Sequence, residues 1–313
     1  MLYLLAVASI DGRNSGKSSQ FHNCEMNNQL LILLQHDKNH RGQISKATIN
    51  YERRLSLRAK INQLKKIRVG AVSYLNTKPL LYGIKRHAVI NEIELIEDYP
   101  SKIAQMLIDD QLDIGLIPVA ATLRLSEWHI DSNYCIGSNG AVASVCIFSQ
   151  VPIEEIKSIY LDYQSRTSVN LAKVLLKEYW KKEVEFMDAT GEDFRGQISG
   201  TTAGVVIGDR ALEQRKKSKY IYDLGEAWKN HTGLPFVFAA WIANKKLPER
   251  FIVAFNEANR LGLESLEEVI KENEFSYFDL RKYYTTCIKY RLDDEKRKGL
   301  ELFLEKLKNL NKA

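Results

Sequence analysis

Short apolar runs alternate with amphipathic stretches along the chain from Ile67 onward. The run Ile67–Val72 is rich in β-branched residues and predicts a strand. A helix is expected to begin near Thr77, because Asn76 is a plausible N-cap and Pro79 suits a first helical turn. Two further strand–helix pairs are expected at 92–97 with 100–112 and at 113–117 with 119–125. This order predicts a parallel sheet wrapped by helices.

A second set of elements begins after Pro152. Strands are expected at 158–161, 183–187, 203–207, 220–224 and 236–243, and a helix at 167–180. From Pro248 onward the pattern predicts an almost wholly helical chain, with helices at 248–271, 277–288 and 293–310.

Two β/α sets followed by a helical C-terminal segment predict an α/β protein with two lobes. Lobe 1 is expected to span about 67–148 plus 244–313, and lobe 2 about 152–236. The apolar segments 142–149 and 236–243 are the expected crossings between the lobes. A ligand would then bind in the cleft, where the carboxyl ends of strands and the amino ends of helices converge.

The first 66 residues do not share this pattern. They are expected to form an N-terminal extension, either poorly ordered or upstream sequence included by a wrong choice of start codon. A cleaved export signal is the alternative, but the apolar run Leu2–Ile10 is short and has no basic flank.

The net charge of the 313-residue chain is +6, and its distribution argues against a nucleic-acid partner. Residues 1–66 hold 11 Lys/Arg and 4 Asp/Glu, whereas the remainder holds 34 basic and 35 acidic residues. The body therefore offers no basic face for nucleic acid, and no apolar run reaches the roughly 18 residues of a membrane span.

The sequence also contains no recognisable motif for binding a metal or a cofactor. The four cysteines and six histidines show no metal-ligand spacing, and the chain has no P-loop or Gly-rich dinucleotide fingerprint. We therefore expect neither a metal nor a cofactor.

Polar residues that follow the predicted strands are the candidates for ligand binding. They are rich in hydroxyls, amides and glycine, and two of the stretches open helices, where free N–H groups and the helix dipole favour anions. The expected ligand is a small organic anion that carries carboxylates. The candidates are Ser73, Tyr74, Asn76, Thr77, Ser138, Gly140, Ser144, Ser165, Arg166, Thr167, Ser168, Asp209, Thr232 and Gly233.

Several of these residues also have a purely structural explanation. Asn76 and Ser165–Ser168 are residue types that cap helices, and Asp209 follows Gly208 at the start of another predicted helix. Ser144 lies inside an apolar run, where an isolated serine is usually a packing residue. Residue chemistry alone therefore predicts a two-lobed binder of a small anion, and leaves enzyme and receptor both open.

Six blocks at these same stretches, in this order, resemble the chorismate dehydratase family of menaquinone biosynthesis. They are Gly70–Leu80, Asp113–Val119, Ser138–Val145, Asp162–Ser168, Ile207–Leu212 and Thr232–Trp241. The resemblance runs from about Ile67 to the C-terminus. It implies a two-lobed, periplasmic-binding-protein-like type 2 fold and a cytoplasmic lyase that converts chorismate to 3-[(1-carboxyvinyl)oxy]benzoate and water, which opens the futalosine route to menaquinone.

The resemblance also sharpens the roles of the candidates. Asn76 and Ser144 are expected to be the catalytic polar contacts, and Ser165, Thr167 and Ser168 the carboxylate holders, with Arg166 as a further grip. No protein base is evident, so the enolpyruvyl carboxylate of the substrate is the expected proton acceptor. Two alternatives share the fold: a sibling enzyme that makes 1,4-dihydroxy-6-naphthoate, and a non-enzymatic solute-binding protein, which should carry an export signal. The oligomeric state is left open.

Overall fold

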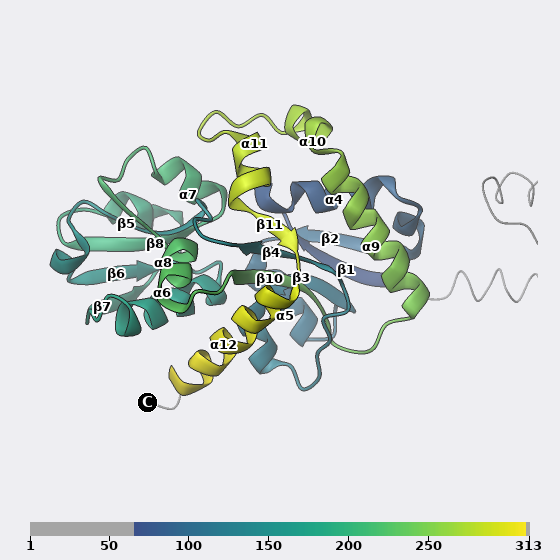
Figure 1. The fold of residues 1–313 in the computed structure, drawn as a ribbon, viewed down its shortest axis with the longest axis horizontal. Coiled ribbons are helices and arrows are strands. Elements are labelled where there is room, and N and C mark those ends of the chain that lie inside the picture. Colours follow the sequence, from purple (N-terminus) through teal and green to yellow (C-terminus); the bar gives the residue numbers. More distant parts are fainter. Residues whose placement is uncertain (1–65, 311–313) are drawn as a thin grey trace, which may run out of the picture. The chain divides into compact units, whose positions relative to one another are not determined.

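The computed structural model describes residues 66–310 of the chain. The chain divides into two units, 1–65 and 66–313, and only the second is described here. Apart from Lys66, the predicted N-terminal extension therefore lies outside the described residues. Within the described part the strands form two sheets, each with its own helices (Figure 1).

The larger sheet has six strands and defines the first lobe. Its order is β11 (Lys289–Arg291), β4 (Tyr134–Ser138), β10 (Phe236–Ala243), β3 (Ile114–Pro118), β1 (Ile67–Val72) and β2 (Ile93–Asp98). β1 pairs in parallel with β2 and β3, which confirms the predicted parallel arrangement for these three strands. β10 pairs antiparallel with β3 and β4, and β11 antiparallel with β4, so the whole sheet is mixed.

The smaller sheet has five strands and defines the second lobe. Its order is β7 (Glu185–Asp188), β6 (Ser158–Leu161), β8 (Thr202–Ile207), β5 (Val145–Ser149) and β9 (Tyr220–Asp223). β6 pairs in parallel with β7 and β8, whereas β5 pairs antiparallel with β8 and β9. β5 and the last five residues of β8 are buried, as expected for the central strands of a covered sheet.

The crossings between the lobes differ from the prediction at two apolar strands, β5 and β10. β5 belongs wholly to the smaller sheet and β10 wholly to the larger one. The chain therefore passes between the sheets at 139–144, before β5, and again between β9 and β10. The prediction that 145–148 belongs to lobe 1 and that 236–243 is itself a crossing was wrong. β10 carries eight largely buried residues and pairs with a strand on each side, which holds it inside one sheet.

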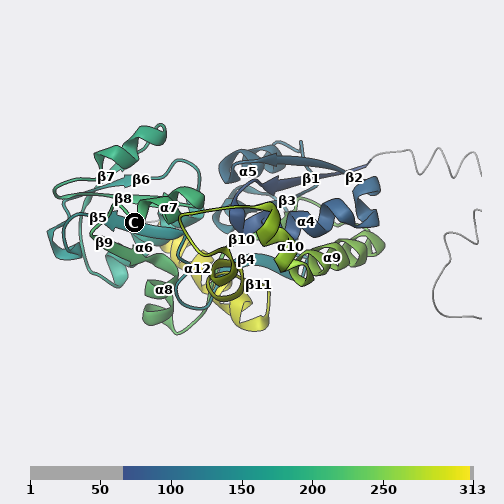
Figure 2. The same cartoon turned by 90° about the horizontal axis from the view of Figure 1, so that it is seen from above.

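Helices cover both sheets, and Figure 2 shows them from above. The α-helices are α4 (Lys78–Arg86), α5 (Pro100–Ile108), α6 (Arg166–Glu178), α7 (Asp209–Gln214), α8 (Leu224–Thr232), α9 (Glu249–Glu264), α10 (Leu266–Glu272), α11 (Leu280–Lys282) and α12 (Asp294–Leu310). The 3-10 helices are η1 (Leu75–Thr77), η2 (Ala88–Glu92), η3 (Val119–Arg124), η4 (Ile153–Glu155) and η5 (Glu192–Gln197), and η6 (Tyr283–Cys287) is a π-helix.

The C-terminal segment is largely helical, as predicted, but β11 interrupts it and completes an edge of the larger sheet. The last helix, α12, packs against β10 and η3 of the first lobe and against α6 of the second, so it contacts both lobes (Figures 1 and 2).

Helix α4, which follows the η1 turn, is held tightly against α9. A β-carbon on Gly262 would lie 1.8 Å from the carbonyl oxygen of Pro79, and one on Gly83 would lie 1.9 Å from that of Ala258. The two helices therefore meet backbone to backbone, which only glycine allows. This contact fixes the start of α4 and the η1 turn that precedes it.

The first passage between the sheets is anchored by Asp223, the N-cap of α8. Its carboxylate accepts hydrogen bonds from the N–H groups of Gly225 (3.0 Å) and Glu226 (3.2 Å) at the start of that helix. It also accepts those of Val142 (3.0 Å) and Ala143 (2.7 Å). Ala143 has a φ of +66°, a conformation that needs such support in a residue with a side chain.

Replacing Asp223→Ala is expected to lower the free energy of unfolding by about 3 kcal/mol, because buried N–H groups of the passage and of α8 lose their acceptor. Chemical denaturation measures this difference. Asp188→Ala, which removes an exposed carboxylate at the end of β7, is the matched control and should change stability by less than about 0.5 kcal/mol. Equal stability of the two variants would contradict the anchoring role.

Candidate functional site

A cavity lies between the two sheets. The cavity is small, and residues of both lobes line it. The first lobe contributes the end of β1, the η1 turn and parts of β3, β4 and β10, and the second lobe contributes the start of β5, the end of β8 and the start of α6. Carboxyl ends of strands and the amino end of a helix thus meet at one place, where open α/β folds bind ligands.

Five of the predicted site residues line this cavity, namely Tyr74, Asn76, Thr77, Ser165 and Ser168. Asn76 lies in η1 rather than at the N-cap of α4, which is Thr77. Its side-chain oxygen accepts a hydrogen bond from the Thr77 hydroxyl (3.1 Å), and its carbonyl oxygen accepts one from the hydroxyl of Tyr290 (2.9 Å). The amide side chain is therefore not used to cap the helix.

The amino end of α6 forms an anion-friendly wall. Ser165 is its N-cap and accepts a hydrogen bond from the N–H of Ser168 (3.3 Å), and the two hydroxyls lie 3.2 Å apart. Because both residues line the cavity, the free N–H groups of the first turn and the positive end of the helix dipole lie beside it. Helix capping and ligand contact, which the sequence left as alternatives for Ser165, are compatible in this geometry.

Two further candidates lie directly beside the lining. Ser144 is fully buried, its hydroxyl accepts a hydrogen bond from Tyr283 (2.7 Å), and its carbonyl oxygen accepts the N–H of Gly208 (2.8 Å). Asp209, at the start of α7 in the second lobe, accepts the N–H of Leu75 in the first lobe, at 3.0 Å and 3.3 Å from its two oxygens. Asp209 therefore links the two lobes next to Asn76.

The remaining candidates do not line the cavity. Ser73 and Arg166 are exposed, and Ser138 is buried away from the cavity. The Thr167 hydroxyl accepts the N–H of Ala120 (2.9 Å), which joins α6 to η3.

The last three belong to backbone turns. Gly140 has a φ of +109° in the first passage between the sheets. Thr232 and Gly233 close the C-terminus of α8, where Gly233 is left-handed and the Thr232 hydroxyl donates to the carbonyl of Trp228 (2.8 Å).

The polar frame around the cavity includes residues that the candidate set missed. The Tyr74 hydroxyl donates to the side-chain oxygen of Gln164, and the Arg210 guanidinium pairs with the buried Asp162 carboxylate (2.8 Å). Burial is the main cause that raises the pKa of Tyr74, so its hydroxyl stays protonated. Gln164, Asp162 and Arg210 fall inside the family-like blocks, which is the signal that would have found them.

Tyr283 and Tyr290 gave no such signal. Tyr283 lies in the predicted helix 277–288 and Tyr290 lies between that helix and the next, and only the fold brings them to Ser144 and Asn76.

Burial also acts on the carboxyl of Asp209. It raises the pKa of Asp209 to about 6, an effect that the N–H of Leu75 and the charge of Lys78 partly offset. The carboxyl group of Asp209 is therefore harder to ionise than that of an exposed aspartate, and it lies beside the cavity.

Within residues 66–310, no helix is long and apolar enough to cross a membrane. The same residues contain no group of three or more His, Cys, Asp or Glu side chains placed to hold a metal ion.

Residues 67–309 match a protein family described as menaquinone biosynthesis. The chain belongs to this family. It is 27% identical over 253 residues to the chorismate dehydratase of Campylobacter jejuni, an alignment that covers 78% of this chain and 99% of that protein. It is 26% identical over 267 residues to the chorismate dehydratase of Thermus thermophilus, covering 76% of this chain and 94% of that protein.

Solved structures with a similar fold show the fold class of this chain. A protein of Archaeoglobus fulgidus superposes with a TM-score of 0.64 at 14% identity, covering 79% of this chain and 98% of that one. A Candida albicans protein described as having the generic periplasmic binding protein fold superposes with a TM-score of 0.53 at 12% identity, covering 80% and 91%. The fold is therefore periplasmic-binding-protein-like, as the sequence resemblance implied.

Replacing Asp209→Asn is expected to stabilise the protein at neutral pH. The folded-state pKa of about 6 lies above the ordinary value of 3.8, so the folded protein keeps a proton that the unfolded chain has already released. This contribution to stability is lost as the pH rises through that window, and the asparagine oxygen can still accept the N–H of Leu75. We expect a gain of about 1–2 kcal/mol at about pH 7.5 that shrinks toward about pH 4.

Denaturation at the two pH values, with Asp131→Asn as the exposed control, measures the difference. A loss of stability in Asp209→Asn that does not depend on pH would contradict the effect of burial.

Proposed function

We propose that this protein is a chorismate dehydratase, a carbon–oxygen lyase that converts chorismate to 3-[(1-carboxyvinyl)oxy]benzoate and water in the cytoplasm as a step of menaquinone biosynthesis. The observation that carries the proposal is the cavity between the sheets. In a member of the menaquinone biosynthesis family, it joins uncharged hydrogen-bonding groups to the amino end of α6. Two relatives that align over most of this chain carry the same activity in their names.

The cavity suits a small dianion. Among the described residues that line it there is no Asp, Glu, Lys, Arg or His, so nothing in the wall repels a carboxylate or holds it as a tight ion pair. The α6 amino end with Ser165 and Ser168 is suited to one carboxylate of chorismate. Leu116, Ile136 and Phe238 provide an apolar surface for the ring.

The reaction removes a proton from ring C3 and the hydroxyl from C4, and the product ring is aromatic. Aromatisation makes the overall change favourable, so the barrier lies in a carbanion-like state in which negative charge spreads onto the ring carboxylate. Neutral donors placed around that carboxylate stabilise the charge as it develops, in the manner of an oxyanion hole. We assign this role to Asn76 and Ser144, which come from the first lobe and from the passage between the lobes.

The proton acceptor is the enolpyruvyl carboxylate of the substrate itself. Among the described residues, the cavity wall offers no carboxylate or imidazole base. Asp209, which follows the lining residue Gly208, has both carboxylate oxygens within hydrogen-bond distance of the N–H of Leu75. The protein then contributes chiefly by holding the substrate in a reactive geometry. This mechanism needs no added cofactor.

The proposal predicts that the full-length protein, incubated with chorismate and no added cofactor or metal, releases water and an aromatic carboxyvinyl ether. Chromatography with mass detection identifies the product, and heat-denatured protein is the control. Binding of chorismate without turnover would point to a solute-binding protein. Turnover only of a later, naphthoate-forming precursor would point to the sibling enzyme. Either result would overturn the proposal.

The assigned roles predict that Asn76→Ala and Ser144→Ala each lower kcat by about 100- to 1,000-fold, because each removes a donor that acts on developing charge. Asn91→Ala and Ser126→Ala, which remove exposed polar groups of the same types away from the cavity, should stay within about twofold of the wild type. Steady-state kinetics on the four variants tests this. Near-normal turnover of both Asn76→Ala and Ser144→Ala removes these residues from the mechanism.

A further inference from the structure

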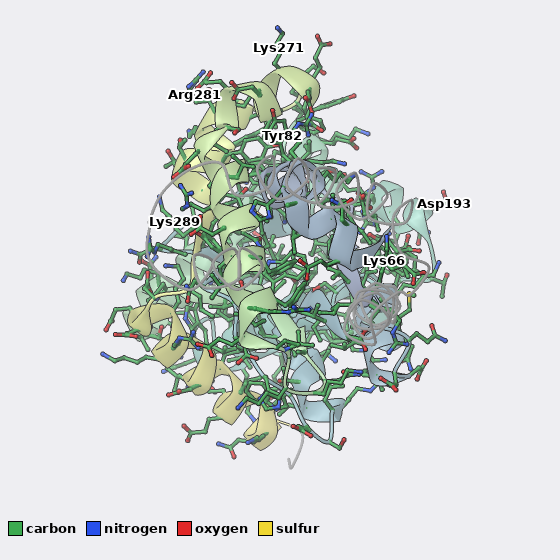
Figure 3. The ribbon with its side chains drawn as sticks, turned by 90° about the vertical axis from the view of Figure 1, so that its right-hand side faces the viewer. Lys66, Tyr82, Asp193, Lys271, Arg281 and Lys289 are labelled. Carbon is green, nitrogen blue, oxygen red and sulfur yellow. The ribbon has the colours of Figure 1, made fainter. Side chains whose placement is uncertain are left out.

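A π-helix near the C-terminus and the short strand that follows it hold three buried tyrosines. The element η6 begins at Tyr283, and its residues Tyr283 and Tyr284 are 0% and 2% exposed, while Tyr290 in β11 is 6% exposed. Arg281, just before this segment, is exposed, and Lys289 lies just after η6 (Figure 3). π-helices are rare and often occur at functional sites, so this one calls for an explanation.

Two of these tyrosines contact the two residues assigned to catalysis. The hydroxyl of Tyr283 donates a hydrogen bond to the hydroxyl oxygen of Ser144 (2.7 Å), and both groups are buried. The hydroxyl of Tyr290 donates to the carbonyl oxygen of Asn76 (2.9 Å). The segment from Tyr283 to Tyr290 therefore holds two residues that are distant in sequence. One is Asn76 in the first lobe, and the other is Ser144 in the passage to the second lobe.

The direction of the Tyr283 bond determines what Ser144 can do. Because the Ser144 oxygen accepts from Tyr283, its own proton is left to donate to another acceptor. A hydroxyl that already accepts a hydrogen bond is a stronger donor, since bonds in a chain polarise one another. Burial raises the pKa of Tyr283 well above its ordinary value, so its hydroxyl keeps the proton that it donates to Ser144.

The ring of Tyr283 is held independently of its hydroxyl. It packs against the rings of Phe278 and Tyr284, with centroids 6.0 Å and 5.7 Å away. A phenylalanine at this position would keep those contacts and lose only the hydrogen bond. The neighbouring Tyr284 provides the matched comparison, because its hydroxyl is buried and has no hydrogen-bond partner among the described residues.

We propose that Tyr283 and Tyr290 are positioning residues for the dehydration, Tyr283 by directing the Ser144 hydroxyl at the substrate and Tyr290 by fixing the peptide of Asn76. This proposal rests on the proposed function. Neither tyrosine lines the cavity, so each acts through the residue that it holds. The C-terminal segment thus becomes part of the site.

Kinetics of Tyr283→Phe and Tyr284→Phe with chorismate test the proposal. Tyr283→Phe should lower kcat by about 10- to 100-fold with little change in KM, because substrate still binds but meets a misdirected donor. Tyr284→Phe should stay within about twofold of the wild type. In a Ser144→Ala background, Tyr283→Phe should add less than about twofold, because its effect passes through Ser144.

The outcomes separate this proposal from the function on which it rests. An inactive wild-type protein overturns the proposed function. An active wild type with Tyr283→Phe equal to Tyr284→Phe overturns the positioning role, and so does a full effect of Tyr283→Phe in the Ser144→Ala background. If Tyr283→Phe does not fold, as judged by its circular dichroism, Tyr290→Phe decides. A kcat several-fold below that of Tyr284→Phe supports the proposal, and an equal kcat overturns it.

Discussion

Backbone N–H groups bound by buried carboxylates hold the walls of the cavity in place. Asp223 binds the passage that leads to Ser144, and Asp209 binds the N–H of Leu75, next to Asn76. Asp162 accepts the N–H of Ile207 (3.2 Å) at the end of β8. Asp162 and Asp223 are buried and Asp209 is partly buried. Loss of water around a carboxylate is unfavourable by itself, and the hydrogen bonds that each one accepts offset that penalty and hold a loop in place.

The three aspartates lie near the cavity but do not line it. The carboxylate oxygens are occupied by backbone groups, and Asp162 is further neutralised by Arg210. The polar groups that line the cavity are hydroxyls, an amide and the amino end of α6, and the rest of the lining is largely apolar. Neutral donors of this kind suit the proposed reaction, in which charge moves across the substrate, because they respond to charge wherever it develops.

Local elements of this fold were predictable from the sequence, whereas their partners were not. The strands β1, β6 and β10 have the bounds that their apolar runs predicted. Neither β4 nor β11 was predicted from the sequence. β11 is a short edge strand, which is defined by its pairing with β4 and not by its own residue pattern. The placement of β5 failed for a related reason, since an apolar strand can be buried equally well in either sheet.

The sequence by itself determined which short stretches could supply a polar site. Its blocks after the strands include Asn76, Ser165 and Ser168, which line the cavity, because strand ends and helix caps have local signatures that a single chain displays. Only the tertiary structure decided which of the equally polar candidates reach the cavity. Thr167 and Thr232 have hydroxyls of the same kind, yet one bonds to η3 and the other closes α8. The tertiary structure also brought Tyr283 to Ser144 across 139 positions, because contacts of that separation depend on packing and leave no mark in the local pattern.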